Sequence, residues 1–236
     1  MKTKAFFNWS GGKDSALALY KALKNEKYEI VSLFTSVNAD SKRISMHGVS
    51  IDLLEKQVEN IGLPLKILEL PSDVDMAGYE KIMLEKMSEF QNMGINTAIF
   101  GDIFLEDVRN YRLEKLVKIN MNADFPLWNT PTKEVISEFI NFGFKTIVTC
   151  INASLLDESF LGRVIDHDFL ADLPENVDIC GENGEFHTFV FDGPIFQKPV
   201  NFTIGEKVYK EYPNPTSDAT DKKPYGFWFC DLIKGE

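Results

Sequence analysis

Residues 4–15 have the sequence Lys-Ala-Phe-Phe-Asn-Trp-Ser-Gly-Gly-Lys-Asp-Ser, and the expected architecture follows from them. Residues 5–9 are mostly apolar and predict a short buried strand that ends near the two glycines. Residues 16–23 are strong helix formers, so a helix over about 13–25 is expected next. Glycines let the backbone come close to an anion, and the free N–H groups of a first helical turn point at it. This strand, turn and helix therefore predict a phosphate-binding loop.

The side chains around the two glycines add to the expected phosphate site. Ser10 and Ser15 supply hydroxyl donors, and Lys13 supplies a positive charge. A polyphosphate would repel Asp14 unless a divalent cation lay between them, so Asp14 predicts Mg²⁺ bound together with a nucleotide. The spacing of a Walker A loop is absent. In the alternative interpretation the two glycines only form a tight turn, and Asp14 only places a favourable negative charge in the first turn of the helix. The complete hexapeptide after the first strand favours the phosphate site.

Composition narrows the class of protein and of partner. The 236 residues suffice for one large domain, or for a main domain with a smaller addition. Lys and Arg number 25 against 36 Asp and Glu, a net charge of −11, which disfavours nucleic acid as the main partner because such binding relies on cationic surface. No apolar run of about 18 residues occurs and the first strand leaves no room for a signal peptide. We therefore expect no membrane partner and a cytoplasmic location.

The cysteines and histidines do not have the spacing of metal ligands. The three cysteines are far apart and lack a C-x-x-C motif: Cys150, Cys180 and Cys230. They fit a reducing compartment, and we expect small buried side chains rather than nucleophiles. For His47 and His187 the sequence leaves open whether they contact a ligand or belong to the scaffold.

Strand and helix patterns alternate through the first half of the chain. Strands are expected at 29–37, 65–70 and 97–100, and helices at 49–61, 75–93 and 105–121. This alternation with short connections predicts an α/β fold with a parallel sheet and helices on both faces. Ligands of such sheets bind beyond the carboxyl ends of the strands. That rule places the glycine turn, residues 35–38 and Gly101-Asp102 on one rim, with the backbone after the second strand near an adenine.

From about residue 120 the pattern changes, and it predicts a second, smaller α/β lobe packed against the rim of the sheet. Strands are expected at 125–128, 145–151, 186–191, 200–204, 207–212 and 226–233, and helices at 132–142 and 166–173. Residues 212–223 contain Pro, Asn, Ser and Asp and predict a surface loop.

Residues 180–188, Cys-Gly-Glu-Asn-Gly-Glu-Phe-His-Thr, form the second stretch with reactive side chains. Glu182 and Glu185, followed by His187 and Thr188, could bind an amine or ammonium, orient a water or ligate a metal. The alternative is an acidic hairpin turn that leads into the strand at 186–191.

The charged residues after the fourth strand also have simple alternatives. Gly101-Asp102 could be a turn with a helix N-cap. Arg109, Arg112 and Glu114 could be a solvated helix face with a weak ion pair.

Six motifs follow one another along nearly the whole chain. They are Ser10–Ser15, Gly101-Asp102-Ile103, Arg109 with Arg112 and Glu114, Pro126-Leu127-Trp128, Leu161-Gly162-Arg163 and Gly181–Thr188. Together they resemble the diphthine–ammonia ligase family of PP-loop ATP pyrophosphatases. The resemblance implies a nucleotide-binding domain of the HUP type, residues 1–122, joined to a substrate-binding domain, residues 123–236. It also implies cleavage of ATP to AMP and pyrophosphate.

The resemblance assigns roles to individual residues. ATP is expected on Ser10, Gly11, Gly12, Lys13, Asp14, Ser15, Gly101 and Asp102. Mg²⁺ is expected at Asp14 through the phosphates. The substrate-side wall is expected to be Glu182, Asn183, Glu185, His187 and Thr188. The expected catalytic residues are Lys13, Asp14, Glu182 and Glu185.

We therefore expect an ATP-dependent amide ligase. It would adenylate a carboxylate on a small molecule or modified protein side chain and amidate it with ammonia or an amine. Lys13 and Mg²⁺ would neutralise the leaving pyrophosphate, and Glu182 or Glu185 would hold or deprotonate the ammonium. The alternative is a non-catalytic ATP- or AMP-binding regulatory module. Chemistry on tRNA is disfavoured by the charge and by the missing cysteine pair, and a homo-oligomer remains open.

The acidic motif departs from the pattern of the eukaryotic and archaeal ligases, which amidate diphthine on translation elongation factor 2. Those ligases usually have Glu-Gly-Gly-Glu followed by Tyr and Glu, whereas this chain has Asn183, Phe186 and His187. The variant resembles a bacterial branch, and bacteria do not make diphthamide. The resemblance thus specifies the ATP chemistry more closely than the acceptor.

Overall fold

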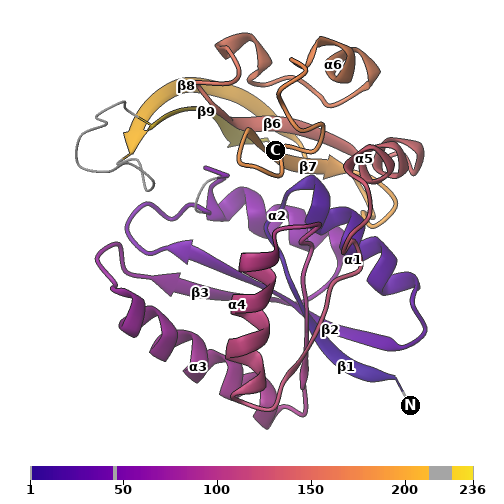
Figure 1. Cartoon of the computed structure of the whole chain (residues 1–236), viewed down its shortest axis with the longest axis vertical. Helices are drawn as coiled ribbons and strands as arrows, with labels where there is room; N and C mark the ends of the chain where they lie inside the picture. Colours follow the sequence, from indigo (N-terminus) through magenta and orange to yellow (C-terminus); the bar gives the residue numbers. More distant parts are fainter. Residues whose placement is uncertain (1, 45–46, 213–224, 236) are drawn as a thin grey trace.

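A computed structural model of the chain describes residues 2–44, 47–212 and 225–235 (Figure 1). It contains a five-stranded sheet and a four-stranded sheet. Helices α1 and α2 lie between the two sheets, and α3 and α4 cover the other face of the first sheet (Figure 1). Among the described residues, none of the helices has the length and apolar character needed to cross a bilayer.

The first sheet is wholly parallel, as predicted. Its strands are β1 (Thr3–Asn8), β2 (Tyr28–Asn38), β3 (Leu65–Leu70), β4 (Thr97–Ile99) and β5 (Asn122–Asp124). Its helices are α1 (Lys13–Lys24), α2 (Ile51–Ile61), α3 (Met76–Asn92) and α4 (Glu106–Val117). The strand order is β3-β2-β1-β4-β5, so the chain order reverses beside β1. Ligands of such sheets bind at this reversal, beyond the carboxyl ends of the strands.

The second sheet is antiparallel. Its strands are β6 (Lys145–Asn152), β7 (Phe186–Asp192), β8 (Phe202–Tyr212) and β9 (Tyr225–Lys234), in the order β7-β6-β9-β8. The helices are α5 (Thr132–Asn141), α6 (His167–Asp172) and a short 3₁₀ turn, η1 (Glu158–Phe160). The two strands expected at 200–204 and 207–212 form one strand with a register shift. The surface loop expected at 212–223 lies, beyond Tyr212, outside the described residues.

The prediction of a strand at residues 125–128 is wrong. These residues form a turn, in which the Trp128 amide donates to the Phe125 carbonyl at 3.0 Å. The apolar pattern has a different cause, because Leu127 is fully buried and the Phe125 ring stacks on Phe100. Pro126 has no N–H to donate to a neighbouring strand.

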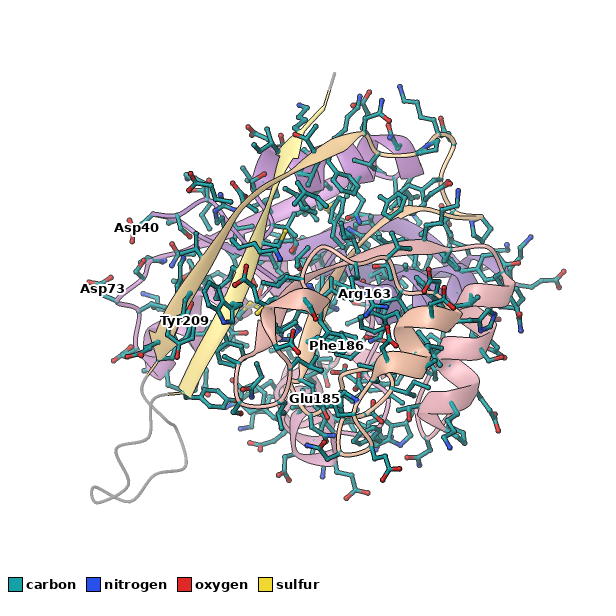
Figure 2. All side chains as sticks on the ribbon, turned by 90° about the horizontal axis from the view of Figure 1, so that it is seen from above. Asp40, Asp73, Arg163, Glu185, Phe186 and Tyr209 are labelled. Atoms are coloured by element: carbon teal, nitrogen blue, oxygen red, sulfur yellow. The ribbon has the colours of Figure 1, made fainter. Side chains whose placement is uncertain are left out.

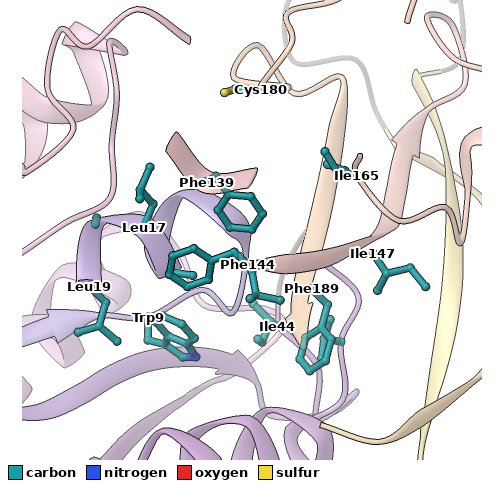
Figure 3. Packing of buried hydrophobic residues seen from close by; sticks show 14 of the residues in the cluster. Trp9, Leu17, Leu19, Ile44, Phe139, Phe144, Ile147, Ile165, Cys180 and Phe189 are labelled. Atoms are coloured by element: carbon teal, nitrogen blue, oxygen red, sulfur yellow. The ribbon is translucent and has the colours of Figure 1, made fainter. Parts of the chain in front are cut away.

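One continuous hydrophobic core joins the two lobes. It contains Trp9 and Leu17 from the first lobe together with Phe139, Phe144 and Phe189 from the second (Figure 3). The second lobe is therefore packed directly over the side of the first sheet on which α1 and α2 lie. The expected boundary at residues 122/123 falls inside β5, and the division into domains stays a prediction.

Removing one ring from this shared core tests whether the lobes unfold together. Phe139 is 1% exposed and stacks on Phe144 with ring centroids 4.9 Å apart. We expect Phe139→Ala to lower the free energy of unfolding by about 3–5 kcal/mol, in one urea transition seen by both fluorescence and circular dichroism. Phe142→Ala is the control, since that ring at the end of α5 is 42% exposed and its loss should cost much less. Equal losses, or two separate transitions, would contradict a shared core.

Candidate active site

The PP-loop (Ser10–Ser15) has the strand–turn–helix geometry that its sequence predicts. Gly11 has φ +80°, a left-handed conformation that favours glycine, and Gly12 is the N-cap of α1. Within the described part of the chain, no hydrogen-bond acceptor is recorded for the backbone amides of Asp14 and Ser15. These two donors are free to bind an anion.

The side chains of the PP-loop form a buried polar cluster. The Ser15 hydroxyl donates to the Gly12 carbonyl at 2.9 Å, and its oxygen lies 3.1 Å from that of Ser10. Lys13 is 4% exposed, and its Nζ lies 2.6 Å from Asp14 Oδ2. Burial lowers the pKa of Lys13, but the Asp14 carboxylate and other nearby acidic groups outweigh burial and raise it. Lys13 therefore keeps its charge at physiological pH.

Gln57 holds the PP-loop from outside it. Its Nε2 donates to the carbonyls of Gly11 at 3.0 Å and Val190 at 2.6 Å, and its Oε1 accepts from Trp9 Nε1 at 2.8 Å. The Val190 amide donates to the same Gly11 carbonyl at 2.9 Å. Gln57 is not among the predicted site residues. Gln57 is fully buried on α2, but its hydrogen-bond partner Val190 lies 133 positions away, so no local sequence signal identifies this role.

The histidines and Thr188 lie where β7 meets the PP-loop. The Lys13 amide donates to Thr188 Oγ1 at 3.0 Å, and His47 Nδ1 lies 3.1 Å from the Thr188 carbonyl. A carbonyl only accepts, so Nδ1 carries the proton. The His47 and His187 rings pack with centroids 4.9 Å apart. Burial lowers the pKa of His47, and burial followed by His47 lowers the pKa of His187 to about 3, so both are neutral at physiological pH.

Glu185 organises the acidic loop (residues 178–185). Glu185 is labelled next to Phe186 in Figure 2. It is 2% exposed, and its Oε1 accepts from the Asp178 amide and from Asn183 Nδ2, both at 3.0 Å. Its Oε2 accepts from the Asn183 amide at 2.8 Å. These hydrogen bonds hold the turn that contains Glu182.

Glu182 has a different environment from Glu185. Its side chain lines the cavity, and burial followed by the charge of Asp14 raises its pKa to about 8, against the opposing effect of Lys13. Asp102 lies in the same electrostatic environment and also raises the pKa of Glu182. The structure thus brings together Asp14, Asp102 and Glu182, which are far apart in the sequence.

Asp102 follows β4 and is paired with Arg112. Arg112 Nη2 lies 3.2 Å from Asp102 Oδ1, and burial raises the pKa of Asp102 against the effect of this arginine. The Arg112 guanidinium stacks over Phe100 at 4.3 Å, and Arg109 stacks over Trp128 at 4.6 Å. The alternative of a solvated helix face therefore fails for both arginines.

Two carboxylate oxygens that have no partner fit a divalent cation. Asp14 Oδ1 and Asp102 Oδ2 are buried and have no hydrogen-bond partner. The described residues contain no group of three His, Cys, Asp or Glu side chains that would hold a metal alone. Mg²⁺ prefers oxygen ligands and is often held by one or two carboxylates together with substrate phosphates. Asp14 and Asp102 are suited to share an ion with a bound polyphosphate.

A cavity of about 1180 Å³ connects these groups. At one end it is lined by Lys13, Asp14 and the acidic loop. At the other end it is apolar and runs between the first sheet and the helices α3 and α4, past Phe34 and Met87. α3 buries little of its surface, which leaves this space open. Of the expected residues 35–38, Thr35 and Ser36 line the cavity, although all four still belong to β2.

The cysteines have no exposed thiol in this cavity. All three are free and buried, as expected, and burial is the main reason that the pKa of each thiol is raised. Cys180 lines the cavity, but its thiol points to the Thr132 carbonyl at 3.3 Å.

Comparison with known proteins shows the family. The profile described as "Diphthamide synthase N-terminal domain" matches residues 1–120, and the one described as "Diphthamide synthase C-terminal domain" matches residues 131–214. The chain belongs to the diphthamide synthase, or diphthine–ammonia ligase, family.

Two relatives show how far this family resemblance extends. The diphthine–ammonia ligase of Bos taurus is 30% identical over 136 residues, which cover 55% of this chain and 49% of the bovine protein. The matched region thus spans about half of that relative. The diphthine–ammonia ligase of Rattus norvegicus is 29% identical over 226 residues, which cover 84% of this chain and 82% of the rat protein. The solved U34-tRNA thiolase NcsA of Methanococcus maripaludis is 17% identical with a TM-score of 0.37, over 60% of this chain and 58% of that one.

Gly101 lets β4 approach the first turn of α1. A Cβ at Gly101 would lie 3.0 Å from Ser15 Cα and 3.1 Å from Ser15 N, and these backbone atoms cannot move independently. We expect Gly101→Ala to lower the free energy of unfolding by about 1–3 kcal/mol and to weaken nucleotide binding, measured by urea unfolding and calorimetry. Gly205→Ala is the control, because a Cβ there would meet only side-chain atoms on the neighbouring strand, none of them closer than 3.2 Å. A Gly101→Ala chain as stable as wild type would contradict this close approach.

The raised pKa of Glu182 makes stability depend on pH. Between its ordinary pKa of 4.5 and the folded value of about 8, the folded chain binds more protons than the unfolded chain. Its contribution to stability therefore falls as the pH rises through this window. We expect Glu182→Gln to melt with wild type at about pH 5 and to melt at least about 2 °C higher at about pH 9. Glu175→Gln, at an exposed position, should follow the wild-type curve, and a Glu182→Gln curve parallel to wild type would contradict the buried carboxyl.

Proposed function

We propose that the chain is an ATP-dependent amide ligase that releases AMP and pyrophosphate. The observation that carries the proposal is the meeting of Lys13, Asp14 and Glu182 in one cavity, where the PP-loop faces the acidic loop. Membership of the diphthine–ammonia ligase family supports the proposal. The alternative of a regulatory nucleotide-binding module needs no ionisable group opposite the phosphates.

The nucleotide is proposed to lie along the cavity. The amides of Asp14 and Ser15 bind the outer phosphates, and Lys13 neutralises them. The adenine occupies the apolar end, where Thr35 and Ser36 present polar groups. Asp14 and Asp102 would hold Mg²⁺ with their free carboxylate oxygens, and Arg112 orients Asp102. When bound, the ion offsets charge on the phosphate oxygens.

In the first step a carboxylate oxygen of the acceptor attacks the α-phosphorus. The bond from this phosphorus to the bridging oxygen breaks, the acyl-adenylate forms, and pyrophosphate leaves with the bonding electron pair. Lys13 is buried and charged, so it stabilises the charge that develops on the leaving group without reorganisation. The loop amides hold the group in line with the attack.

In the second step ammonia attacks the carbonyl carbon of the acyl-adenylate. The carbon–oxygen bond to AMP breaks, the amide forms, and the nitrogen loses a proton. Glu182 is proposed to accept this proton in its carboxylate form, which is a stronger base than an ordinary carboxylate because its pKa is raised to about 8, and which becomes more populated as the pH rises. Glu185 is proposed as a positioning residue, since both of its oxygens hold the loop that carries Glu182.

The proposed acceptor is a carboxylate on a small molecule or on a modified protein side chain. The relatives that the chain matches are named diphthine–ammonia ligases, which supports a carboxylate acceptor and ammonia as donor. The net charge of −11 supports such an acceptor over nucleic acid. Asn183, Phe186 and His187 differ from the usual motif, and they lie on the side of the cavity proposed for the acceptor.

The test is the identity of the products. The chain is incubated with ATP, Mg²⁺, ammonium and candidate carboxylates, and AMP and pyrophosphate are expected in equal amounts. Lys13→Gln should lower kcat by about a hundredfold to a thousandfold, because a buried cation at the leaving group is lost. Lys24→Gln, at the exposed end of α1, should leave kcat unchanged. Release of ADP and phosphate would rule out the mechanism, and bound ATP without turnover for every acceptor would favour the regulatory module.

A further inference from the structure

Thr188 caps α1 from the other lobe. In many helices the side chain of the N-cap residue accepts a hydrogen bond from a backbone amide of the first turn. The N-cap of α1 is Gly12, which has no side chain to give. The Lys13 amide donates instead to Thr188 Oγ1, which lies 175 positions later in the sequence and belongs to β7.

The Thr188 hydroxyl retains a donor with no acceptor. A hydroxyl accepts with its lone pairs and donates one hydrogen. Thr188 Oγ1 accepts from the Lys13 amide, so its hydrogen points elsewhere, and no acceptor is recorded for it within the described ranges. Thr188 is 3% exposed and lines the cavity. A buried donor without an acceptor is unfavourable, so a ligand that supplies an acceptor would be favoured here.

Other donors without acceptors lie beside this hydroxyl. They are the amides of Asp14 and Ser15, which follow the amide that Thr188 caps. The position of Thr188 is fixed by its neighbours, because its carbonyl accepts from His47 and the Val190 amide donates to Gly11. The hydroxyl is thus held at the N-terminal end of α1, in whose first turn the two free amides lie.

We propose that the Thr188 hydroxyl donates a hydrogen bond to a β- or γ-phosphate oxygen of ATP. This proposal rests on the ATP site proposed above. It moves Thr188 from the expected substrate-side wall to the phosphate-binding set. It also means that the phosphate site is complete only when β7 of the second lobe lies against the PP-loop.

The test compares the binding of pyrophosphate, ATP and AMP by calorimetry in the full chain. Thr188→Val keeps the shape of the side chain and removes the hydroxyl. It should lower the affinity for pyrophosphate and for ATP by about tenfold or more, because hydrogen bonds to charged groups are strong. AMP lacks the outer phosphates, so the affinity of the variant for AMP should stay within about threefold of the wild-type affinity. Thr188→Ser keeps the donor and should bind all three like wild type. Thr146→Val is the matched control, a buried threonine on β6 whose hydroxyl has no partner.

The outcomes separate this proposal from the function on which it rests. Thr188→Val binding pyrophosphate as tightly as wild type would overturn it, as would an equal loss for AMP or a failure of Thr188→Ser to restore binding. If the valine variant does not fold, Thr188→Cys replaces it, since a thiol is a weak donor of similar size, and the same losses are expected. A wild-type chain that binds neither ATP nor pyrophosphate would overturn the proposed function itself.

Discussion

The carbonyl oxygen of Gly11 is the point on which the site depends. It accepts hydrogen bonds from the Gln57 side chain and from the Val190 amide, so the PP-loop is tied to α2 and to β7 at once. A loop with two glycines has many accessible conformations, and these hydrogen bonds hold the one that leaves the first-turn amides free. All atoms of the Gln57 amide that can hydrogen-bond have buried partners, which makes this small network rigid rather than costly.

The charges of the site suit a divalent cation. Asp14, Asp102 and Glu182 act on one another electrostatically in a partly buried space, and the nearby basic groups are Lys13 and Arg112. Burial and the neighbouring carboxylates raise the pKa of Glu182, and one oxygen each of Asp14 and Asp102 has no partner. A site of this kind lowers the stability of the free chain in exchange for charge that is already in place when a metal-bound polyphosphate arrives.

Local sequence signals are sufficient for the first sheet and for the PP-loop, because strand, turn and helix follow one another within residues 4–25. They fail at 125–128, where an apolar run packs as a turn against α4 and its neighbours instead of pairing as a strand. They also fail for Gln57 and for the cap by Thr188. Both act through partners far away in the sequence, so periodicity and propensity contain no trace of the contact. The environments that distinguish Glu182 from Glu185 likewise appear only after folding.

The most direct test of the central claim is a crystal structure of the chain with Mg²⁺ and α,β-methylene-ATP, an analogue that cannot release pyrophosphate. We predict that outer phosphate oxygens lie within about 2.7–3.2 Å of the amide nitrogens of Asp14 and Ser15, and that the α-phosphorus faces Glu182 across the cavity. A nucleotide bound elsewhere, or a PP-loop that stays empty at saturating analogue, would contradict it.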